Sequence, residues 1–294
     1  MNHTLKILHK RARIIQQIRS FFIERKFLEV ETPHRIETNA PEPHIDAVES
    51  TGMWLQTSPE LAMKRLLAAG CGNIFQLCRV WRGNERGSRH LPEFSLLEWY
   101  RPHSDYHSLM TDCENLLLKL VPEKSLTYRG ERIDLAPPWR RLTVKEAFRL
   151  YADCSAEQAI ENNRFEEVLT DQVEPALGFG PIFLTEYPAP LAALARLKSD
   201  DTSVAERCEL YIGGLELANG FSELTDPAEQ RIRFEADEEE RRRQGKPPCP
   251  LPEDFLADLH NMPEAAGIAL GVDRLVMLLT DAASIDEVVA FPPG

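Results

Sequence analysis

The sequence predicts an α+β fold in which an antiparallel sheet is flanked by helices. Three observations predict it. Segments with helical and strand-like spacing follow one another in the order helix, strands, helical insertion, strands, helix. Neighbouring strand-like segments are joined by glycine-containing turns, as in antiparallel hairpins. No βαβ repeat and no short internal period is visible. We expect a single domain over residues 1–294.

The first elements are a long helix and short strands. Isoleucine and phenylalanine recur at helical spacing in residues 5–25 and predict a helix. Residues 27–32 alternate like a strand that stops at Pro33. Residues 34–50 indicate a loop, and residues 53–56 a short strand.

A second helix is predicted to begin at Ser58-Pro59-Glu60, since serine can cap, proline suits the first turn and glutamate suits the positive end. Gly70 would end it. The apolar runs 74–81 and 94–100 then predict an antiparallel hairpin with a long charged tip.

Helices dominate the predicted middle of the chain. Residues 105–120 have helical spacing, and Thr143 with Glu146 forms a capping-box pattern. We expect the insertion of about residues 125–200 to be mostly helical, with a strand near residues 182–187.

The last third returns to strands. Residues 204–219 have strand character broken at Gly213-Gly214, which predicts a hairpin. A helix should run from Asp226 to about Gln244. Residues 267–271 indicate a small-residue strand and residues 272–279 a final helix.

Composition narrows the function classes. The chain has 34 Lys and Arg against 47 Asp and Glu, a net charge of −13, which disfavours nucleic acid as a partner. Its six cysteines form no CxxC pair and no zinc-site spacing with histidine. No signal-peptide core and no apolar run long enough for a membrane span is present. We therefore expect a cytoplasmic protein with free thiols and no membrane partner.

Arginines gather at the tip of the first hairpin. Four arginines and His90 lie within residues 79–90, and Phe94 follows. Guanidinium groups bind phosphate oxygens in pairs, so this tip can hold a polyphosphate while an aromatic ring stacks on a base. A solvated basic loop is the alternative.

Carboxylates mark two further strands. Glu98 and Tyr100 are two residues apart on a strand, so they share a face that suits an ammonium group, although a single satisfied glutamate is common. Glu209, Glu216 and Glu223 recur every seven residues, and Glu209 and Glu216 could face each other across the Gly-Gly hairpin. Such carboxylates suit Mg²⁺ bridged to substrate phosphates, or they are simply exposed.

The segment from Gly267 to Arg274 combines small residues with a cation. Glycine and alanine permit close approach to a ligand, and Arg274 at a helix start can reach a phosphate. Tight packing alone is the alternative.

These segments resemble the motifs of class II aminoacyl-tRNA synthetases. The first helix, strand and Pro33 resemble motif 1, the hairpin with Arg82 motif 2, and Gly271-Val272-Asp273-Arg274 motif 3. The run Glu-Leu-Ala-Asn-Gly-Phe-Ser-Glu-Leu that ends at Leu224 resembles the lysyl subgroup. The resemblance spans about residues 5–290 and implies the class II catalytic fold and a homodimer.

Within that subgroup the chain is most similar to the elongation factor P–(R)-β-lysine ligase family. The stretches that carry this resemblance include residues 57–60, 63–67, 75–79 and 92–103. The first motif begins almost at Met1, so we expect no N-terminal anticodon-binding domain. Ala269 stands where lysyl-tRNA synthetases usually have glycine, which implies a reshaped amino-acid pocket.

The resemblance implies that ATP and Mg²⁺ are the cofactors. Arg82 would hold the α-phosphate and, with Arg274, act as a catalytic residue. Glu209 and Glu216 would hold the metal. The ATP-binding set would comprise Arg82, Gly83, Asn84, Glu85, His90, Leu91, Phe94, Glu216, Leu217, Gly271 and Arg274.

The resemblance also implies an amino-acid pocket for lysine or β-lysine. Glu98 would pair with the amino group near the carboxylate, and Tyr100, Asn219 and Glu223 would surround the far ammonium. Ser58, Pro59, Glu60 and Ala269 would complete the lining. Asn84 and Leu91 depart from the family pattern, and we expect these departures to alter the affinity for the nucleotide more than the activity.

The implied activity is ATP-dependent formation of an acyl-adenylate and transfer of the acyl group to a lysine side chain of elongation factor P, without tRNA. Two alternatives stay open. One is a truncated lysyl-tRNA synthetase-like enzyme that acts on tRNA. The other is a non-catalytic paralogue that binds amino acid or nucleotide for regulation.

Overall fold

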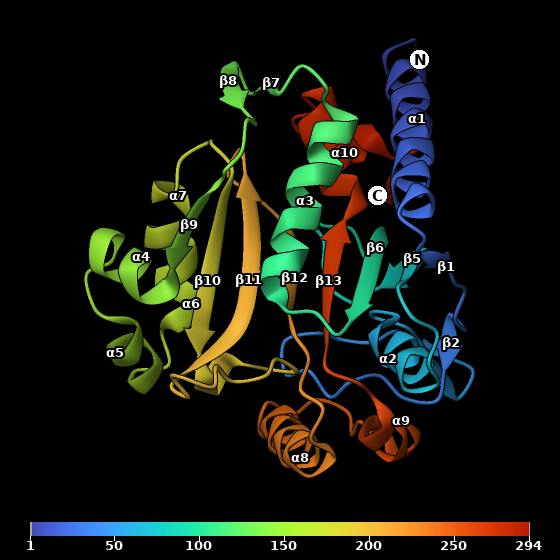
Figure 1. Ribbon diagram of the computed structural model, residues 1–294, viewed down its shortest axis with the longest axis vertical. Helices are drawn as coiled ribbons and strands as arrows, with labels where there is room; N and C mark the ends of the chain where they lie inside the picture. Colours follow the sequence, from blue (N-terminus) through green and yellow to red (C-terminus); the bar gives the residue numbers. More distant parts are fainter. Residues whose placement is uncertain (1, 294) are drawn as a thin grey trace.

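The computed structural model describes residues 2–293, and an eight-stranded sheet forms its centre (Figure 1). Its strand order is β1-β5-β6-β13-β12-β11-β10-β9. These strands are β1 (Leu28–Glu29), β5 (Ile74–Trp81), β6 (Glu93–Pro102), β9 (Arg140–Thr143), β10 (Ile182–Pro188), β11 (Val204–Ile212), β12 (Leu215–Ser222) and β13 (Ala265–Gly271). Two smaller sheets contain β2 (Arg35–Ile36), β3 (Glu49–Ser50) and β4 (Met53–Leu55), and β7 (Ser125–Tyr128) and β8 (Glu131–Asp134).

Helices surround this sheet. The α-helices are α1 (Asn2–Glu24), α2 (Glu60–Ala68), α3 (Tyr106–Leu120), α4 (Val144–Tyr151), α5 (Ala156–Glu161), α6 (Phe165–Val168), α7 (Glu174–Ala176), α8 (Pro227–Arg243), α9 (Glu253–Asp258) and α10 (Val272–Thr280). Short segments of π-helix, η1 (Leu169–Val173), and 3-10 helix, η2 (Ala189–Leu191), η3 (Leu259–Asn261) and η4 (Ile285–Val288), complete them.

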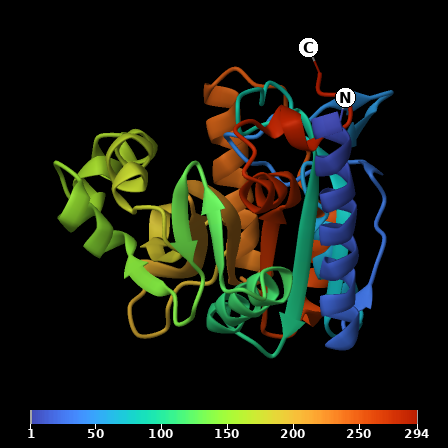
Figure 2. The ribbon, with the colours of Figure 1, turned by 90° about the horizontal axis from the view of Figure 1, so that it is seen from above.

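The α+β class and both predicted hairpins are confirmed, but the sheet is mixed rather than purely antiparallel. Strands β1 and β5 are parallel, and so are β9 and β10; the other neighbouring strands are antiparallel. A parallel pair requires a long crossover connection. Between β9 and β10 that connection contains helices α4 to α7, which form a lobe beside the sheet edge (Figure 2).

The insertion is less helical than expected. Its first part, residues 125–143, forms strands β7, β8 and β9, and its α-helices lie within residues 144–176. The predicted capping box is present, because Thr143 Oγ1 accepts from the Glu146 N–H at 3.1 Å while Glu146 Oε2 accepts from the Thr143 N–H at 3.0 Å. The predicted strand over residues 27–32 is reduced to β1.

Two other segments also differ from the sequence-based expectation. The loop predicted over residues 34–50 contains β2 and β3, which both pair with β4. Helix α9, which follows the proline-rich loop after α8, was not predicted. These elements are too short for hydrophobic periodicity to reveal them.

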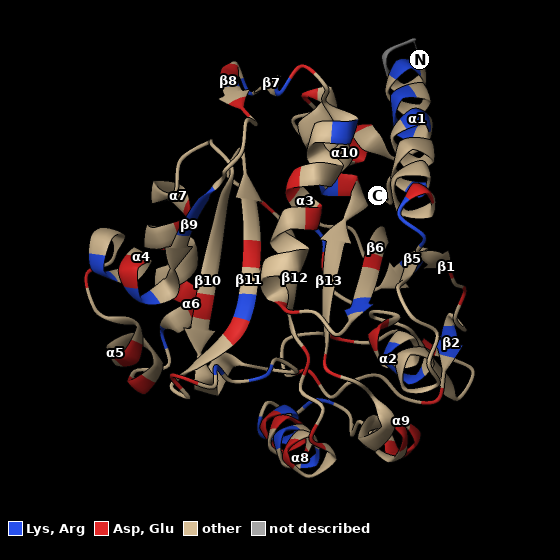
Figure 3. Ribbon diagram, in the orientation of Figure 1, with Lys and Arg blue, Asp and Glu red and all other residues tan. Residues whose placement is uncertain are grey.

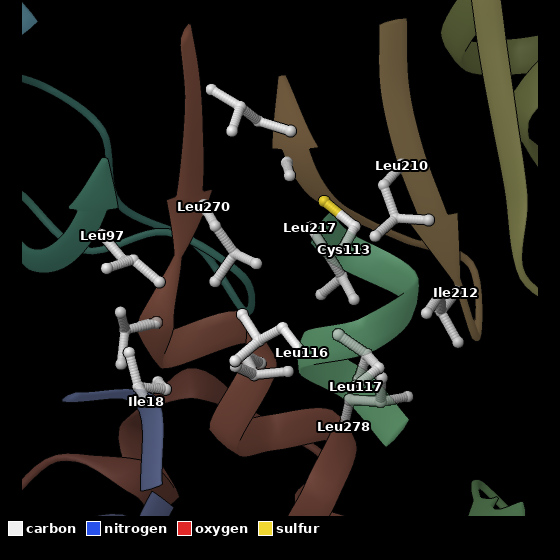
Figure 4. Packing of buried hydrophobic residues seen from close by; sticks show 14 of the residues in the cluster. Ile18, Leu97, Cys113, Leu116, Leu117, Leu210, Ile212, Leu217, Leu270 and Leu278 are labelled. Carbon is white, nitrogen blue, oxygen red and sulfur yellow. The ribbon is translucent and has the colours of Figure 1, made fainter. Parts of the chain in front are cut away.

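One face of the sheet is apolar and carries the main core. Leu97, Leu270, Ala218 and Leu210 lie opposite one another on β6, β13, β12 and β11. Because directly opposed residues share a face, they form one continuous apolar row. Leucines of α3 and α10 pack on this row (Figure 4). The helices therefore cover this face and leave the other for polar side chains.

The other end of the molecule carries α8 and α9, which lie beyond the lower ends of β12 and β13 in Figure 1. Helix α2 contacts α9, and Phe234 of α8 packs with Phe255 of α9 in a smaller core. In residues 2–293, no helix combines the length and apolar character that a membrane crossing requires.

Candidate active site

The polar face of the sheet contains a trough along β13. Gly267 and Ala269 of β13 lie opposite Tyr100 and Glu98 of β6 on one side. A Cβ atom on Gly267 would come within 2.2 Å of the Tyr100 ring. Glycine is therefore required there, and the small residues of β13 leave room between larger side chains.

The opposite wall of the trough comes from β12 and the chain that follows it. Asn219 and Phe221 lie opposite Ala269 and Gly267. A Cβ atom on Gly267 would also lie 2.5 Å from Glu223 Oε1. Hence Glu223, which follows β12, points over the same glycine as Tyr100.

Glu98 lies at the floor of the trough and is almost fully buried, at 1% exposed. Ser58 Oγ donates to its Oε1 at 2.5 Å, and the Tyr100 hydroxyl donates to its Oε2 at 3.0 Å. Burial, together with the charge of Glu60, raises the pKa of Glu98 to about 8, although the two hydrogen bonds oppose the shift. A bound cation would therefore favour the ionised carboxylate.

Sequence reasoning missed Lys64, a buried cation in the same pocket. Its Nζ lies 2.6 Å from Glu60 Oε1 and 2.6 Å from Glu223 Oε2. Glu223 is buried, and burial raises its pKa to about 8 although Lys64 lowers it. The ion pair fixes both carboxylates before any ligand arrives.

The formal charge of this pocket suits a dication. Glu60, Glu98 and Glu223 contribute three negative charges when ionised, and Lys64 contributes one positive charge. The difference is two negative charges. Buried charges are retained only when they are paired, so a ligand with two ammonium groups completes the pocket.

The second part of the site is built around Arg274, near the start of α10. Its Nη1 donates to the Glu216 carbonyl at 2.8 Å and to Glu216 Oε2 at 3.1 Å, and its Nη2 donates to His90 Nε2 at 2.5 Å. Burial and the Arg274 charge lower the pKa of His90, so the ring accepts this bond in its neutral form. A polyphosphate could replace these partners of the guanidinium.

Arg82 lies at the root of the β5–β6 hairpin. Its guanidinium is 5.2 Å from the Phe94 ring and 4.0 Å from Glu85 Oε1, and its Nε donates to the Thr57 carbonyl at 3.4 Å. These contacts are long, and the side chain is about one quarter exposed. The guanidinium is therefore accessible to a phosphate.

The neighbours of Arg82 in the hairpin tip have structural contacts. The Gly83 N–H donates to the Asp46 carbonyl at 2.6 Å, and Asn84 Nδ2 donates to Asp46 Oδ2 at 3.4 Å. Leu91 is buried in the main core. Asn84 thus contacts the loop before β3, and neither Gly83 nor Asn84 lines the cavity described below.

A buried ion pair connects α10 with the first helix. Arg11 of α1 pairs with Asp273 of α10, and Arg11 Nη2 donates to Ser95 Oγ at 2.8 Å. The Ser95 N–H donates to Asp273 Oδ2 at 2.7 Å. Asp273 adjoins Arg274, so this network fixes the start of α10 relative to α1 and β6.

The sequence suggested that Glu209 and Glu216 could face each other across the β11–β12 hairpin, but the two residues are not opposite each other. The Gly213-Gly214 turn places Tyr211 opposite Glu216, and an extra residue on β12, Leu217, then places Glu209 opposite Asn219. An insertion of one residue on one strand changes which residues are opposed.

The Glu209 carboxylate is surrounded by donors. Its Oε1 accepts from Arg207 Nη2 at 2.7 Å and from Asn219 Nδ2 at 3.2 Å, and its Oε2 accepts from the Tyr211 hydroxyl at 2.7 Å. Among residues 2–293, no group of three or more His, Cys, Asp and Glu side chains is arranged to hold a metal ion. One or two carboxylates plus substrate phosphates suffice for Mg²⁺, so the donor set of Glu209 and Glu216 suits it only together with a polyphosphate.

A cavity of about 1000 Å³ joins the trough to the arginines. Its lining includes these predicted site residues: Ser58, Glu60, Arg82, Glu85, His90, Leu91, Phe94, Glu98, Tyr100, Glu216, Leu217, Asn219, Ala269, Gly271 and Arg274. The lining lacks Pro59, Gly83, Asn84, Glu209 and Glu223. It includes Glu42, Arg207 and Asp237, which the sequence analysis missed.

Comparison with known proteins agrees with this arrangement. The family model described as tRNA synthetases class II (D, K and N) matches residues 1–293. The elongation factor P–(R)-β-lysine ligase of Mannheimia succiniciproducens is 44% identical over 308 residues, covering 98% of this chain and 95% of that protein. The proteins of the same name from Haemophilus influenzae and Klebsiella pneumoniae are each 42% identical, with at least 97% of this chain and 94% of the relative covered.

Proposed function

Because the chain belongs to the class II tRNA synthetases (D, K and N), and within them to the elongation factor P–(R)-β-lysine ligase family, we propose the following reaction for it. It activates (R)-β-lysine, or lysine, with ATP as an acyl-adenylate. It then transfers the acyl group to a lysine side chain of elongation factor P. The enzyme is thus a ligase that forms an amide and converts ATP to AMP and pyrophosphate.

The observation that carries this proposal is the pocket beside the arginines, whose three carboxylates exceed its single lysine by two negative charges when all are ionised. Lysine and β-lysine each carry two ammonium groups, which the carboxylates of Glu98 and Glu223 would receive. Tyr100, Asn219, Ser58 and Glu60 would orient the chain of the substrate. Ala269 lies between Glu98 and Asn219 on the trough floor, so its methyl group would set where the amino group rests.

Activation needs positioning and charge stabilisation rather than a base. The amino-acid carboxylate is already ionised when it attacks the α-phosphorus of ATP. Arg82 would hold the α-phosphate, Arg274 and His90 the outer phosphates, and Phe94 the adenine ring. Mg²⁺ held by Glu209, Glu216 and the phosphates would neutralise the charge that develops on the phosphate oxygens.

The remaining proposals concern partners. We also propose that the acceptor is elongation factor P, in agreement with the names of the relatives, and that tRNA is not a substrate. The single-domain organisation, a homodimer and a cytoplasmic location also remain proposals. Domain number and dimer formation can be measured by limited proteolysis and light scattering.

Two assays test the function. Amino-acid-dependent exchange of pyrophosphate into ATP should occur with β-lysine or lysine. Mass spectrometry of elongation factor P incubated with the protein, ATP and each isomer should detect the added acyl group. Absence of exchange with both isomers would favour a non-catalytic binding role, and acylation of tRNA in place of elongation factor P would favour a synthetase-like role.

A further inference from the structure

The cavity extends beyond the trough and the arginines into an outer part that activation does not use. Its lining there comes from the loop of residues 41–45, from α8, and from the α5–α6 segment. Three of these lining residues, His44, Asn163 and Gln244, are exposed. The cavity therefore reaches solvent between these segments, and α8 carries charged side chains along its length (Figure 3).

Glu42 lies in this outer part, with a fixed main chain and a free carboxylate. Arg241 Nη1 donates to the carbonyls of Glu42 at 2.9 Å and Ile45 at 3.0 Å, and the Glu42 N–H donates to the Ala40 carbonyl at 2.8 Å. Within residues 2–293, the Glu42 carboxylate has no hydrogen bond or ion pair. The backbone thus holds an unpaired acid inside the cavity.

Charged groups from four elements face this carboxyl group. They are Arg82 of the β5–β6 hairpin, Glu60 of α2, Asp237 of α8 and Arg207 of β11. Burial raises the pKa of Glu42 to about 7, and Arg82 opposes that shift more than any other neighbour. Glu42 therefore lies close enough to Arg82 and Glu60 for their charges to act on it, and all three side chains line the same cavity.

The transfer step, which rests on the proposed function, needs a proton acceptor that activation does not need. A lysine side chain of the acceptor protein arrives as an ammonium, with a pKa of about 10.4, and has no lone pair for attack. A general base works best when its pKa is close to the working pH. Asp237 and Glu42 both line the cavity, so an amine that enters its outer part from solvent could contact both carboxylates.

We infer that Glu42 is the general base of the transfer step and that the outer cavity is the channel for the acceptor lysine. Glu42 takes one proton from the ammonium. The nitrogen then attacks the acyl carbon, the bond from that carbon to the phosphate oxygen breaks, and AMP leaves with the electron pair. The nitrogen loses its second proton to water, which leaves an amide.

The test separates the two half-reactions in the Glu42→Gln variant, which keeps the shape of the side chain. Pyrophosphate exchange should stay within about twofold of wild type. Single-turnover transfer from preformed adenylate to elongation factor P should fall by about 100-fold at pH 7, as removal of a general base predicts. Capture of the adenylate by hydroxylamine, which is uncharged at neutral pH, should be unchanged.

The pH profile gives a readout that a purely structural role would not change. Wild-type transfer should rise with pH through about 7 and then level off, and Glu42→Gln should lose this plateau. Asp237→Asn removes a neighbouring negative charge and should shift the plateau to lower pH. Glu240→Gln is the matched control, because Glu240 lines the same cavity but pairs with Arg243 at 3.0 Å.

Equal transfer rates in wild type and Glu42→Gln would overturn this role while leaving the proposed function intact. Loss of exchange in Glu42→Gln would overturn it as well, because the carboxylate would then serve activation. A wild-type protein that performs exchange but does not modify elongation factor P would overturn the proposed acceptor itself.

Discussion

The amino-acid end and the nucleotide end of the cavity are built in opposite ways. At the amino-acid end, Glu98 and Lys64 are each 1% exposed, and hydrogen bonds or ion pairs within the chain hold both side chains. At the nucleotide end, the side chains of Arg274 and Glu216 are 21% and 37% exposed. The Arg274 guanidinium donates both to the Glu216 carboxylate and to the Glu216 main-chain carbonyl. One end is fixed before the substrate arrives, whereas the other holds its cations with partners that a phosphate can replace.

The largest expected effect comes from a substitution at the nucleotide end of the cavity. Arg82→Ala should reduce adenylate formation by about 1000-fold, because the α-phosphate loses its cation as charge develops. Its side chain has only long contacts in the free protein, so the fold should be unaffected. Pyrophosphate exchange measures the loss, and Arg86→Ala, at the exposed tip of the same hairpin, is the control. Near-normal exchange in Arg82→Ala would refute its assigned role.

The next largest effect comes from a substitution at the amino-acid end of the cavity. Lys64→Met leaves two carboxylates without their buried partner and should lower the free energy of unfolding by about 3 kcal/mol at pH 8. Urea denaturation measures this change. Lys119→Met, which removes an exposed pair with Glu24, should cost less than about 1 kcal/mol. Equal losses in the two variants would contradict the contrast between the ends.

The pH dependence of amino-acid binding sharpens the comparison. Glu98 and Glu223 have raised pKa values of about 8, so both are largely protonated in the empty pocket at pH 6. A ligand with two ammonium groups binds the ionised forms, so binding releases protons. Affinity therefore rises from pH 6, by up to about tenfold per unit for each proton, and levels off near pH 8. Calorimetry in buffers of different ionisation enthalpy measures the release. The Glu98→Gln variant should release fewer protons, and a wild-type protein that releases none would exclude this linkage.

The smallest expected effect concerns selectivity within the amino-acid end. Ala269→Gly should shift preference toward α-lysine by about tenfold, the scale of one methyl group in a pocket. The exchange rates with the two isomers give the ratio. Ala266→Gly, on the opposite face of the same strand, should leave that ratio unchanged. An unchanged ratio in Ala269→Gly would show that the methyl group is not the discriminator.

Local pattern was sufficient for much of the fold and for the groups on single strands. Alternation on β6 placed Glu98 and Tyr100 on one face, and their hydrogen bond confirms it. The local sequence pattern did not predict contacts between residues that are far apart in the sequence. Lys64 has the spacing of an ordinary cation on an amphipathic helix, and only the folded chain brings Glu223 beside it. Long-range pairs of this kind leave no periodic signal.

Two other features of the site could not be predicted from the sequence, the partner of Glu209 and the position of Glu42. The bulge at Leu217 of β12 changed the partner of Glu209, and nothing in the neighbouring residues indicates an extra residue in a strand. Glu42 lies in a loop between prolines, where its backbone is fixed by Arg241, almost two hundred residues away. The sequence indicated the phosphate and ammonium groups that the site would take, but not the outer cavity.

The salt bridge between Arg11 and Asp273 has a mechanical consequence. It anchors the first helix to the residue that adjoins Arg274, so α1 and the start of α10 must move together. A displacement of α1 would therefore change the position of Arg274, the residue that we propose receives the outer phosphates of the nucleotide.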